Sequence, residues 1–216
     1  MLQGIVVNKG FIASLAIVLA SVAFSVQAQS LPKPKEFYFD EDRSAAPTAG
    51  VSAVEGEALV DQLAKARERG RRIVEATAQL AHVAINDGRV DLGKQLYQQA
   101  LASTQNGGTV WRSISWNYGW DLYRLGEYGP AVQQWAPLVT TVGGPSWVPP
   151  TLALGLWSEG RKAEAVEWYG AAVRTEPTQW TDPANFARML PAWSEAERAK
   201  LAEVHAAWLA NPPRWP

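Results

Sequence analysis

The stretch WNYGWDLYRLGEYGPAVQQW, residues 116–135, decides the fold. It places three Trp and three Tyr in two segments whose apolar residues recur at helical spacing, with Gly126 between the segments. A glycine accommodates the left-handed backbone that commonly ends a helix. The stretch therefore predicts two short amphipathic helices joined by a tight turn. It leaves open whether its aromatic side chains form a core or a surface that holds a ligand.

The pattern around Gly126 recurs around Gly88 and around Gly160, which follows Gly126 by 34 residues. Each glycine has a small residue seven positions before it, another five positions after it, and an aromatic residue nine positions after it. Small residues let two helices cross closely, and the aromatic residue fills the space beside the next hairpin. One hairpin cannot bury its own apolar face, so several must stack. The repeated positions are Ala81, Gly119 and Ala153, then Gly93, Ala131 and Ala165, and finally Tyr97, Trp135 and Tyr169.

At these positions the chain resembles the tetratricopeptide repeat family, whose 34-residue unit carries W-x2-L-G-x2-Y, then A-x3-F, then P. The best copies are YGWDL followed by AVQQW, and LALGL followed by AVEWY with Pro177 at the end. The leading Trp of the family is replaced by Thr77, Ser115 and Pro149. The resemblance implies an all-α, helical-hairpin solenoid of about three repeats with capping helices at both ends.

The ends of the chain differ from the repeats. Residues 1–28 contain the apolar run FIASLAIVLASVAFSV and end in VQA, which predicts a signal peptide cleaved after Ala28. The alternative is an uncleaved anchor, but the run is short for a bilayer span. We expect a periplasmic or secreted protein with no stable membrane insertion after cleavage. Ser194 and Glu197 predict a capping box before a final amphipathic helix.

These features divide the chain into five parts. A linker or arm rich in Pro, Gly and charge follows the signal peptide, and its aromatic residues 37–39 are a candidate contact with the folded body. The expected parts are the signal peptide 1–28, the arm 29–52, an N-terminal capping helix 53–73, the repeats within 74–177 (74–107, 112–145 and 146–179), and C-terminal capping helices with a tail in 178–216.

Composition excludes several functions. A formal net charge of −1 gives no bulk basic patch, so nucleic acid is not an expected partner. The chain has no Cys and only two His, which argues against disulfides, a thiol nucleophile and a multi-histidine metal site. No phosphate-binding loop, G-x-S-x-G or H-E-x-x-H motif is present. We therefore expect no cofactor and no catalysis; His82 is the one candidate base within the repeats.

The first helix of the middle hairpin carries the candidate binding residues. Tyr118, Gly119 and Leu122 take its packing stripe, which leaves other aromatic and polar residues at spacings of three and four on another face. By resemblance, first helices line a concave groove that holds a partner. The predicted groove residues are Trp116, Asn117, Trp120, Tyr123 and Arg124, with His82 from the preceding repeat and Trp147 and Trp157 from the following one.

Two interpretations of this face stay open. Trp116, Trp120 and Tyr123 either line a groove or are covered by the curved array or the arm. Some family members bind acidic peptide C-termini with Lys, Arg and Asn; Asn117 matches that pattern, but Ala78 and His82 depart from it, which disfavours that ligand.

The sequence supports three functions in decreasing order. The first is a non-catalytic periplasmic scaffold that binds a protein or extended peptide partner through this groove, since large aromatics with a few polar anchors suit extended or Pro-rich peptides. The second is a glycan- or peptidoglycan-binding module, because Trp rings stack on sugar rings. The third is a cell-envelope hydrolase, which lacks a credible acid or nucleophile.

Overall fold

The computed structural model describes residues 31–34, 57–68, 72–140 and 147–214, and every regular element in these ranges is a helix. The predicted signal peptide and residues 37–39 lie outside the described residues. The all-α fold class expected from the sequence is confirmed. The elements are α1 (Glu57–Glu68), α2 (Ile73–Asn86), α3 (Val90–Ala102), α4 (Thr109–Arg124), α5 (Tyr128–Trp135), η2 (Ala136–Thr140), α6 (Val148–Glu159), α7 (Lys162–Thr175), α8 (Pro177–Trp180), η3 (Pro183–Asn185), α9 (Phe186–Met189) and α10 (Glu195–Ala210).

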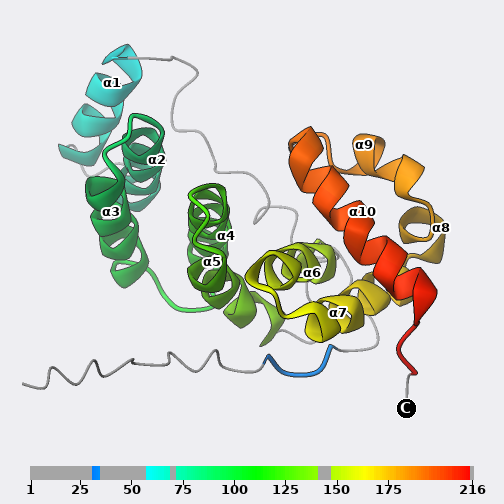
Figure 1. Cartoon of the computed structure of the whole chain (residues 1–216). Coiled ribbons are helices and arrows are strands. Elements are labelled where there is room, and N and C mark those ends of the chain that lie inside the picture. Colours follow the sequence, from blue (N-terminus) through cyan, green and yellow to red (C-terminus); the bar gives the residue numbers. More distant parts are fainter. Residues whose placement is uncertain (1–30, 35–56, 69–71, 141–146, 215–216) are drawn as a thin grey trace, which may run out of the picture.

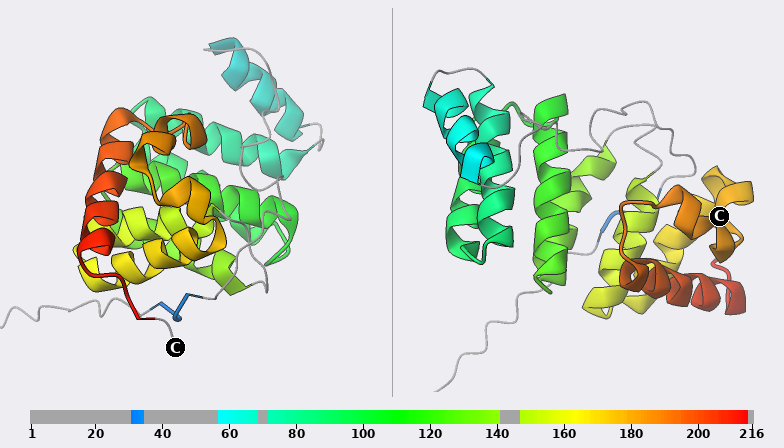
Figure 2. Two further views of the ribbon diagram at one scale, coloured as in Figure 1. Left: turned by 90° about the vertical axis from the view of Figure 1, so that its right-hand side faces the viewer. Right: turned by 90° about the horizontal axis from the view of Figure 1, so that it is seen from above.

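Helices adjacent in the chain pack as pairs. The helix α2 packs on α3, α4 on α5 and α6 on α7, and each pair also contacts the next one through α3·α4, α2·α4 and α5·α6. The pairs follow one another in a row, with α1 at one end and α8 to α10 at the other (Figure 1, Figure 2). The last helix, α10, packs on both α6 and α7.

The three pairs share one turn geometry. Gly88, Gly126 and Gly160 have φ angles of 80°, 81° and 93°, in the left-handed region. In each turn the residue after the glycine donates its backbone N–H to a carbonyl five positions back, at 2.8 to 2.9 Å. Glycine adopts this backbone without the steric cost of a Cβ atom. The repeated glycine therefore sets the same reversal of the chain three times.

Close helix crossings explain the small residues of the pattern. A Cβ atom on Gly119 would lie 2.2 Å from Nε1 of Trp135, and one on Gly93 would lie 2.4 Å from Cγ1 of Ile85. The indole N–H of Trp135 donates to the Trp116 carbonyl at 3.1 Å. The three repeated aromatics are fully buried, as their expected role in packing between hairpins requires: Tyr97, Trp135 and Tyr169.

The C-terminal segment covers the end of the row and returns toward α4. Ser194 and Glu197 form the expected capping box at the start of α10, with the Glu197 N–H donating to Ser194 Oγ and the Ser194 N–H to the Glu197 carboxylate. Leu201 and Val204 of α10 are buried. The Tyr169 hydroxyl donates to the Trp180 carbonyl at 2.6 Å and fixes α8 on α7.

Residues 31–34 lie against the same end of the row. Pro34 is buried and Leu31 packs against the core. The pKa of Glu164 on α7 is lowered, first by its hydrogen bonds from Arg161 and also by a backbone hydrogen bond from Leu31. The short blue segment in Figure 1 is thus anchored beside α7 by backbone and side-chain contacts.

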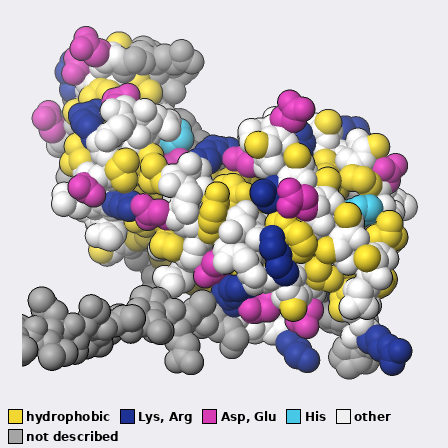
Figure 3. All heavy atoms as spheres, viewed as in Figure 1, with side chains coloured by type: hydrophobic (Ala, Val, Ile, Leu, Met, Phe, Trp, Pro, Cys, Tyr) yellow, Lys and Arg dark blue, Asp and Glu magenta, His cyan; other side chains and the backbone are white. Residues whose placement is uncertain are grey.

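None of the helices in the described part of the chain is long and apolar enough to cross a bilayer. On the face shown in Figure 3, acidic and basic side chains alternate with apolar ones, and the outline is hollowed between the α1–α2 end and the C-terminal helices.

Candidate functional site

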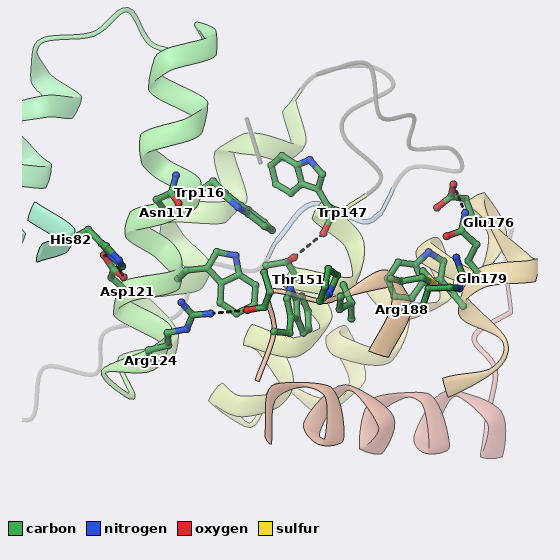
Figure 4. Close-up of a pocket in the computed structure, with 17 residues that line it drawn as sticks. His82, Trp116, Asn117, Asp121, Arg124, Trp147, Thr151, Glu176, Gln179 and Arg188 are labelled. Atoms are coloured by element: carbon green, nitrogen blue, oxygen red, sulfur yellow. Dashed lines mark hydrogen bonds and ion pairs between the residues drawn. The ribbon is translucent and has the colours of Figure 1, made fainter. Parts of the chain in front are cut away.

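A cavity of about 790 Å³ lies between α4 and the segment that joins α7 to α10 (Figure 4). One wall consists of residues that recur every three to four positions along α4, with contributions from α2 and from the start of α6. The other wall is the irregular segment from α8 to the start of α10. The lining residues are His82; Trp116, Asn117, Trp120, Asp121 and Arg124; Trp147 and Thr151; and Glu176, Gln179, Trp180, Arg188, Met189, Leu190, Pro191, Ala192 and Trp193.

Tryptophan rings pack against one another along the cavity. The ring centroids of Trp116 and Trp147 are 3.9 Å apart, and the Trp120 ring meets the Trp193 ring edge-on at 4.9 Å. Trp116 and Trp120 are each 7% exposed, so only a small part of either ring faces the cavity. These rings therefore serve both proposed roles: they belong to the buried aromatic cluster, and they form the cavity wall.

The indole N–H of Trp147 is buried and has no acceptor among the described residues. A buried donor without an acceptor is costly unless water or a ligand provides one. The hydroxyl of Thr151, in contrast, donates to the Trp147 carbonyl at 2.8 Å. The Trp147 indole N–H is thus a buried donor without an acceptor beside the cavity, within the part of the chain that the structure describes.

Asp121 is a buried carboxylate that connects three helices. Its Oδ1 and Oδ2 atoms lie 2.9 and 3.0 Å from Nδ1 of His82 on α2, and the Tyr97 hydroxyl on α3 donates to Oδ2 at 2.7 Å. These hydrogen bonds compensate for the removal of the charge from water. The carboxylate therefore points into the packing between α2, α3 and α4, and the imidazole lies at the cavity rim.

The contacts with Asp121 raise the pKa of both His82 and Tyr97. The hydrogen bond from His82 to Asp121 raises the pKa of His82 above its ordinary value of 6.5; burial and the nearby Arg124 act in the opposite direction. Burial first, and then the Asp121 charge, raise the pKa of Tyr97 well above 10. The amide nitrogen of Asn86 lies 3.0 Å from Nε2 of His82, so both ring nitrogens have a neighbour.

Arg124 connects the two walls at one end of the cavity. Its Nε donates to Oε1 of Glu197 at 3.1 Å, and its guanidinium lies 5.3 Å from the centroid of the Trp120 ring. A longer contact of 3.5 Å joins Nη2 to the Ala192 carbonyl, and Figure 4 shows the side chain reaching across to this wall. Because Glu197 belongs to the capping box, Arg124 couples the end of α4 to the start of α10.

The cavity brings together six of the eight residues predicted for the groove. These are His82, Trp116, Asn117, Trp120, Arg124 and Trp147. The structure does not bring Tyr123 and Trp157 to it. The hydroxyl of Tyr123 lies 2.9 Å from Oγ of Ser158, and the indole N–H of Trp157 donates to Glu203 of α10 at 2.9 Å. Trp157 is partly covered, because α10 packs on α6 and Lys162 lies over the ring.

Sequence reasoning missed Asp121 and the whole opposite wall. The only sequence signal for Asp121 was that it is the single acidic residue in the predicted first helix of the middle hairpin. The wall residues Trp180, Arg188 and Trp193 lie in a segment with no helical period long enough to indicate where it packs. Within the described ranges, no group of three or more His, Asp or Glu side chains is arranged to hold a metal ion.

Comparison with known proteins assigns no family, because no family model, no curated protein and no solved structure matches the chain. The structure itself supports an all-helical domain of paired adjacent helices with a buried aromatic cluster.

Proposed function

We propose that this protein is a non-catalytic, tetratricopeptide-like scaffold that binds an extended peptide segment of a protein partner in the cavity beside α4. The observation that carries the proposal is the cavity itself, where tryptophan side chains and polar or charged side chains line the same walls. Binding pockets typically have this composition. The three glycine turns and the small residues at the crossings support the repeat assignment, because the small residues stand at the same distances from each turn glycine and Gly160 follows Gly126 by 34 residues.

The chemistry of the rim favours peptide recognition. Arg188 is exposed, lines the cavity and makes no ion pair within the described residues. Trp and Arg side chains frequently dominate the binding energy of protein interfaces.

The same contacts weigh against the two other functions. A sugar ring stacks on an open indole face, whereas Trp116 and Trp120 are engaged with other rings. The Trp157 ring carries Lys162 at 3.7 Å. As for hydrolysis, Nε2 of His82 faces Asn86, and the Thr151 hydroxyl is used by a backbone carbonyl. A scaffold without catalysis fits these side chains better.

Selection from a displayed random-peptide library, followed by fluorescence titration of the tryptophans, tests the proposal. We expect a selected peptide to bind Arg188→Glu about tenfold more weakly than the parent chain, a loss of about 1.4 kcal/mol. Arg214→Glu, an exposed site that does not line the cavity, is the matched control and should bind normally. Melting by circular dichroism confirms that both variants fold.

Two results would overturn peptide binding. One is the failure of any peptide to be enriched. The other is equal affinity of a selected peptide for the parent chain and Arg188→Glu. If the parent chain is retained on purified peptidoglycan and the Arg188→Glu variant is not, the glycan-binding function would be established instead.

Secretion is the second part of the proposal and has a separate test. The predicted cleavage after Ala28 lies just before the anchored residues 31–34. Mass spectrometry of the extracytoplasmic form should show a chain that starts at Gln29. An intact chain starting at Met1 in the membrane fraction contradicts it.

A further inference from the structure

We propose that Asn106, in the turn between α3 and α4, is a site of spontaneous covalent modification: its side-chain amide is lost through a succinimide, and isoaspartate or aspartate takes its place. The proposal does not depend on what the cavity binds. Three observations carry it: the glycine that follows Asn106, the exposure of the turn, and the contacts that protect the other asparagines of the described residues.

The reaction joins the side chain of Asn106 to the backbone of the next residue. The backbone nitrogen of Gly107 loses its proton to solvent and attacks Cγ of Asn106. The bond from this nitrogen to Cγ forms, the bond from Cγ to Nδ2 breaks, and the amide leaves as ammonia. Water then opens the cyclic imide, giving aspartate by attack at Cγ and isoaspartate by attack at the backbone carbonyl carbon. In sum, water is consumed and ammonia released, and no oxidant, reductant or cofactor takes part.

The backbone of the turn favours this attack. Gly107 has a φ angle of 80°, and the Gly108 N–H donates to the Gln105 carbonyl at 3.1 Å, which closes a turn over residues 105–108. Glycine presents no side chain that would shield its nitrogen, and two consecutive glycines give the backbone wide conformational freedom. A Cβ atom on Gly107 would meet nothing within 4 Å, so the space beside the turn is open. The nitrogen is therefore unhindered.

Both reacting groups are accessible to water. Residues 105–107 are exposed. Within the described part of the chain, neither the Asn106 amide nor the Gly107 N–H makes a hydrogen bond. An N–H that donates to a carbonyl loses its proton less readily, and an amide held by a hydrogen bond is less able to meet the nitrogen. The turn lacks both kinds of protection.

Two other asparagines are protected by their helices. The N–H that follows Asn86 belongs to Asp87 and donates to the Val83 carbonyl at 3.0 Å, so this nitrogen is engaged. Asn117 lies inside α4, where its amide donates to the Ser113 carbonyl at 2.7 Å. Cyclisation at either position requires local unfolding of a helix.

The remaining two asparagines of the described residues are protected in other ways. The amide of Asn185 donates to the carbonyls of Thr178 and Gln179 at 3.3 and 3.2 Å, which holds the side chain in place. Asn211 is followed by Pro212, whose nitrogen carries no proton to lose. The turn before α4 thus holds the single unprotected asparagine within the described ranges.

The modification changes the charge at the entry to α4. Each product carries a carboxylate where the parent chain has a neutral amide, and α4 begins three residues later, at Thr109, with no acidic residue in its first turn. A negative charge near a helix N-terminus is favourable, so the aspartate product is compatible with the fold. Isoaspartate lengthens the turn by one backbone carbon. The folded chain therefore becomes more acidic as it ages.

Incubation of the purified full chain in mildly alkaline buffer tests the proposal. Samples taken over time are digested and mapped by liquid chromatography and mass spectrometry, and isoaspartate is identified with isoaspartyl methyltransferase. We expect conversion at Asn106 to be at least tenfold faster than at any other described asparagine, a difference of about 1.4 kcal/mol in activation free energy. Ion-exchange chromatography should show an acidic species that grows at the same rate.

Two variants and a peptide complete the experiment. Asn106→Gln should not form the acidic species, because the larger imide ring of glutamine closes far more slowly. Asn86→Gln is the matched control and should form it at the parental rate, and melting by circular dichroism checks that both variants fold. A synthetic peptide of residues 103–112 gives the rate for the turn outside the fold. If Asn106 stays intact in the folded chain while the peptide is converted, or if Asn86 and Asn106 react equally fast, the proposal is overturned.

Discussion

At Asp121 a single carboxylate holds α2, α3 and α4 together. Its side chain is 4% exposed, and it accepts hydrogen bonds from His82 and Tyr97. A buried charge is tolerated only when such bonds replace those to water. The residue is therefore a structural link between hairpins that also orients His82 at the cavity rim.

Replacing Asp121 tests this link. Asp121→Asn keeps the shape but removes the charge, so we expect the free energy of unfolding to fall by about 2 kcal/mol. Urea denaturation followed by circular dichroism measures it. Asp87→Asn is the control, because Asp87 is an exposed carboxylate paired with Arg89; its effect should stay within about 0.5 kcal/mol. Equal midpoints for both variants would contradict the structural role.

The raised pKa of His82 makes stability depend on pH. A histidine with a pKa above its unfolded value of 6.5 binds its proton more tightly when folded. Its stabilisation is complete below pH 6.5 and is lost as the pH rises through the folded pKa. We expect the stability difference between the parent chain and His82→Gln to shrink across that window. A His82 NMR titration with a midpoint at or below 6.5 contradicts the expectation.

At the scale of the element, helix crossings depend on single small residues. The crossing of α4 with α5 leaves no room for a Cβ atom on Gly119, because the indole of Trp135 fills the space. Trp135 is fixed by its own hydrogen bond to Trp116. The position is thus constrained from both helices.

Gly119→Ala should therefore be destabilising although alanine favours helix. We expect a loss of about 1 to 3 kcal/mol from overpacking, measured by thermal unfolding. Gly129→Ala in α5 is the control: its Cβ would meet the carboxylate end of Glu159 at 3.1 Å, which can move. Stabilisation by Gly119→Ala, as helix propensity alone would give, argues against the close crossing.

The capping box of α10 is a second element-level test. Ser194→Ala removes the acceptor for the Glu197 N–H and should cost about 1 kcal/mol. Because Glu197 also pairs with Arg124, hydrogen exchange should rise at the start of α10 and in the wall around Trp193. Faster exchange confined to the C-terminal end of α10 would contradict this coupling.

At the scale of the molecule, the C-terminal helices both close the row and complete the cavity. The helix α10 covers the apolar faces of α6 and α7, and the segment before it forms a cavity wall. Removal of residues 178–216 would uncover Tyr169, which the intact chain buries and whose ring contacts His205 and Trp208.

We expect this truncation to bind a hydrophobic dye strongly and to self-associate on size-exclusion chromatography. A chain that lacks only residues 214–216 is the control, and it should elute and melt like the full chain. A monomeric, dye-free truncation with a cooperative melt would show that α8 to α10 are dispensable for the core.

The sequence by itself determined the helical hairpins and their turns. Gly88, Gly126 and Gly160, with the small and aromatic residues at fixed distances from them, encode local backbone and nearest-neighbour packing, which follow from helical periodicity. The capping box at Ser194 was equally visible, because its two partners are three residues apart.

Only the tertiary structure decided which aromatics line the cavity. Trp147 and Trp157 were equal candidates from helical register, but the Trp157 indole bonds to Glu203 of α10 instead of lining the cavity, and that contact joins residues 46 apart in sequence. The bond from Arg124 to Glu197 spans 73 residues and the one from His82 to Asp121 spans 39. Such pairs depend on how whole helices are placed, and periodicity along one helix carries no information about the partner that covers it.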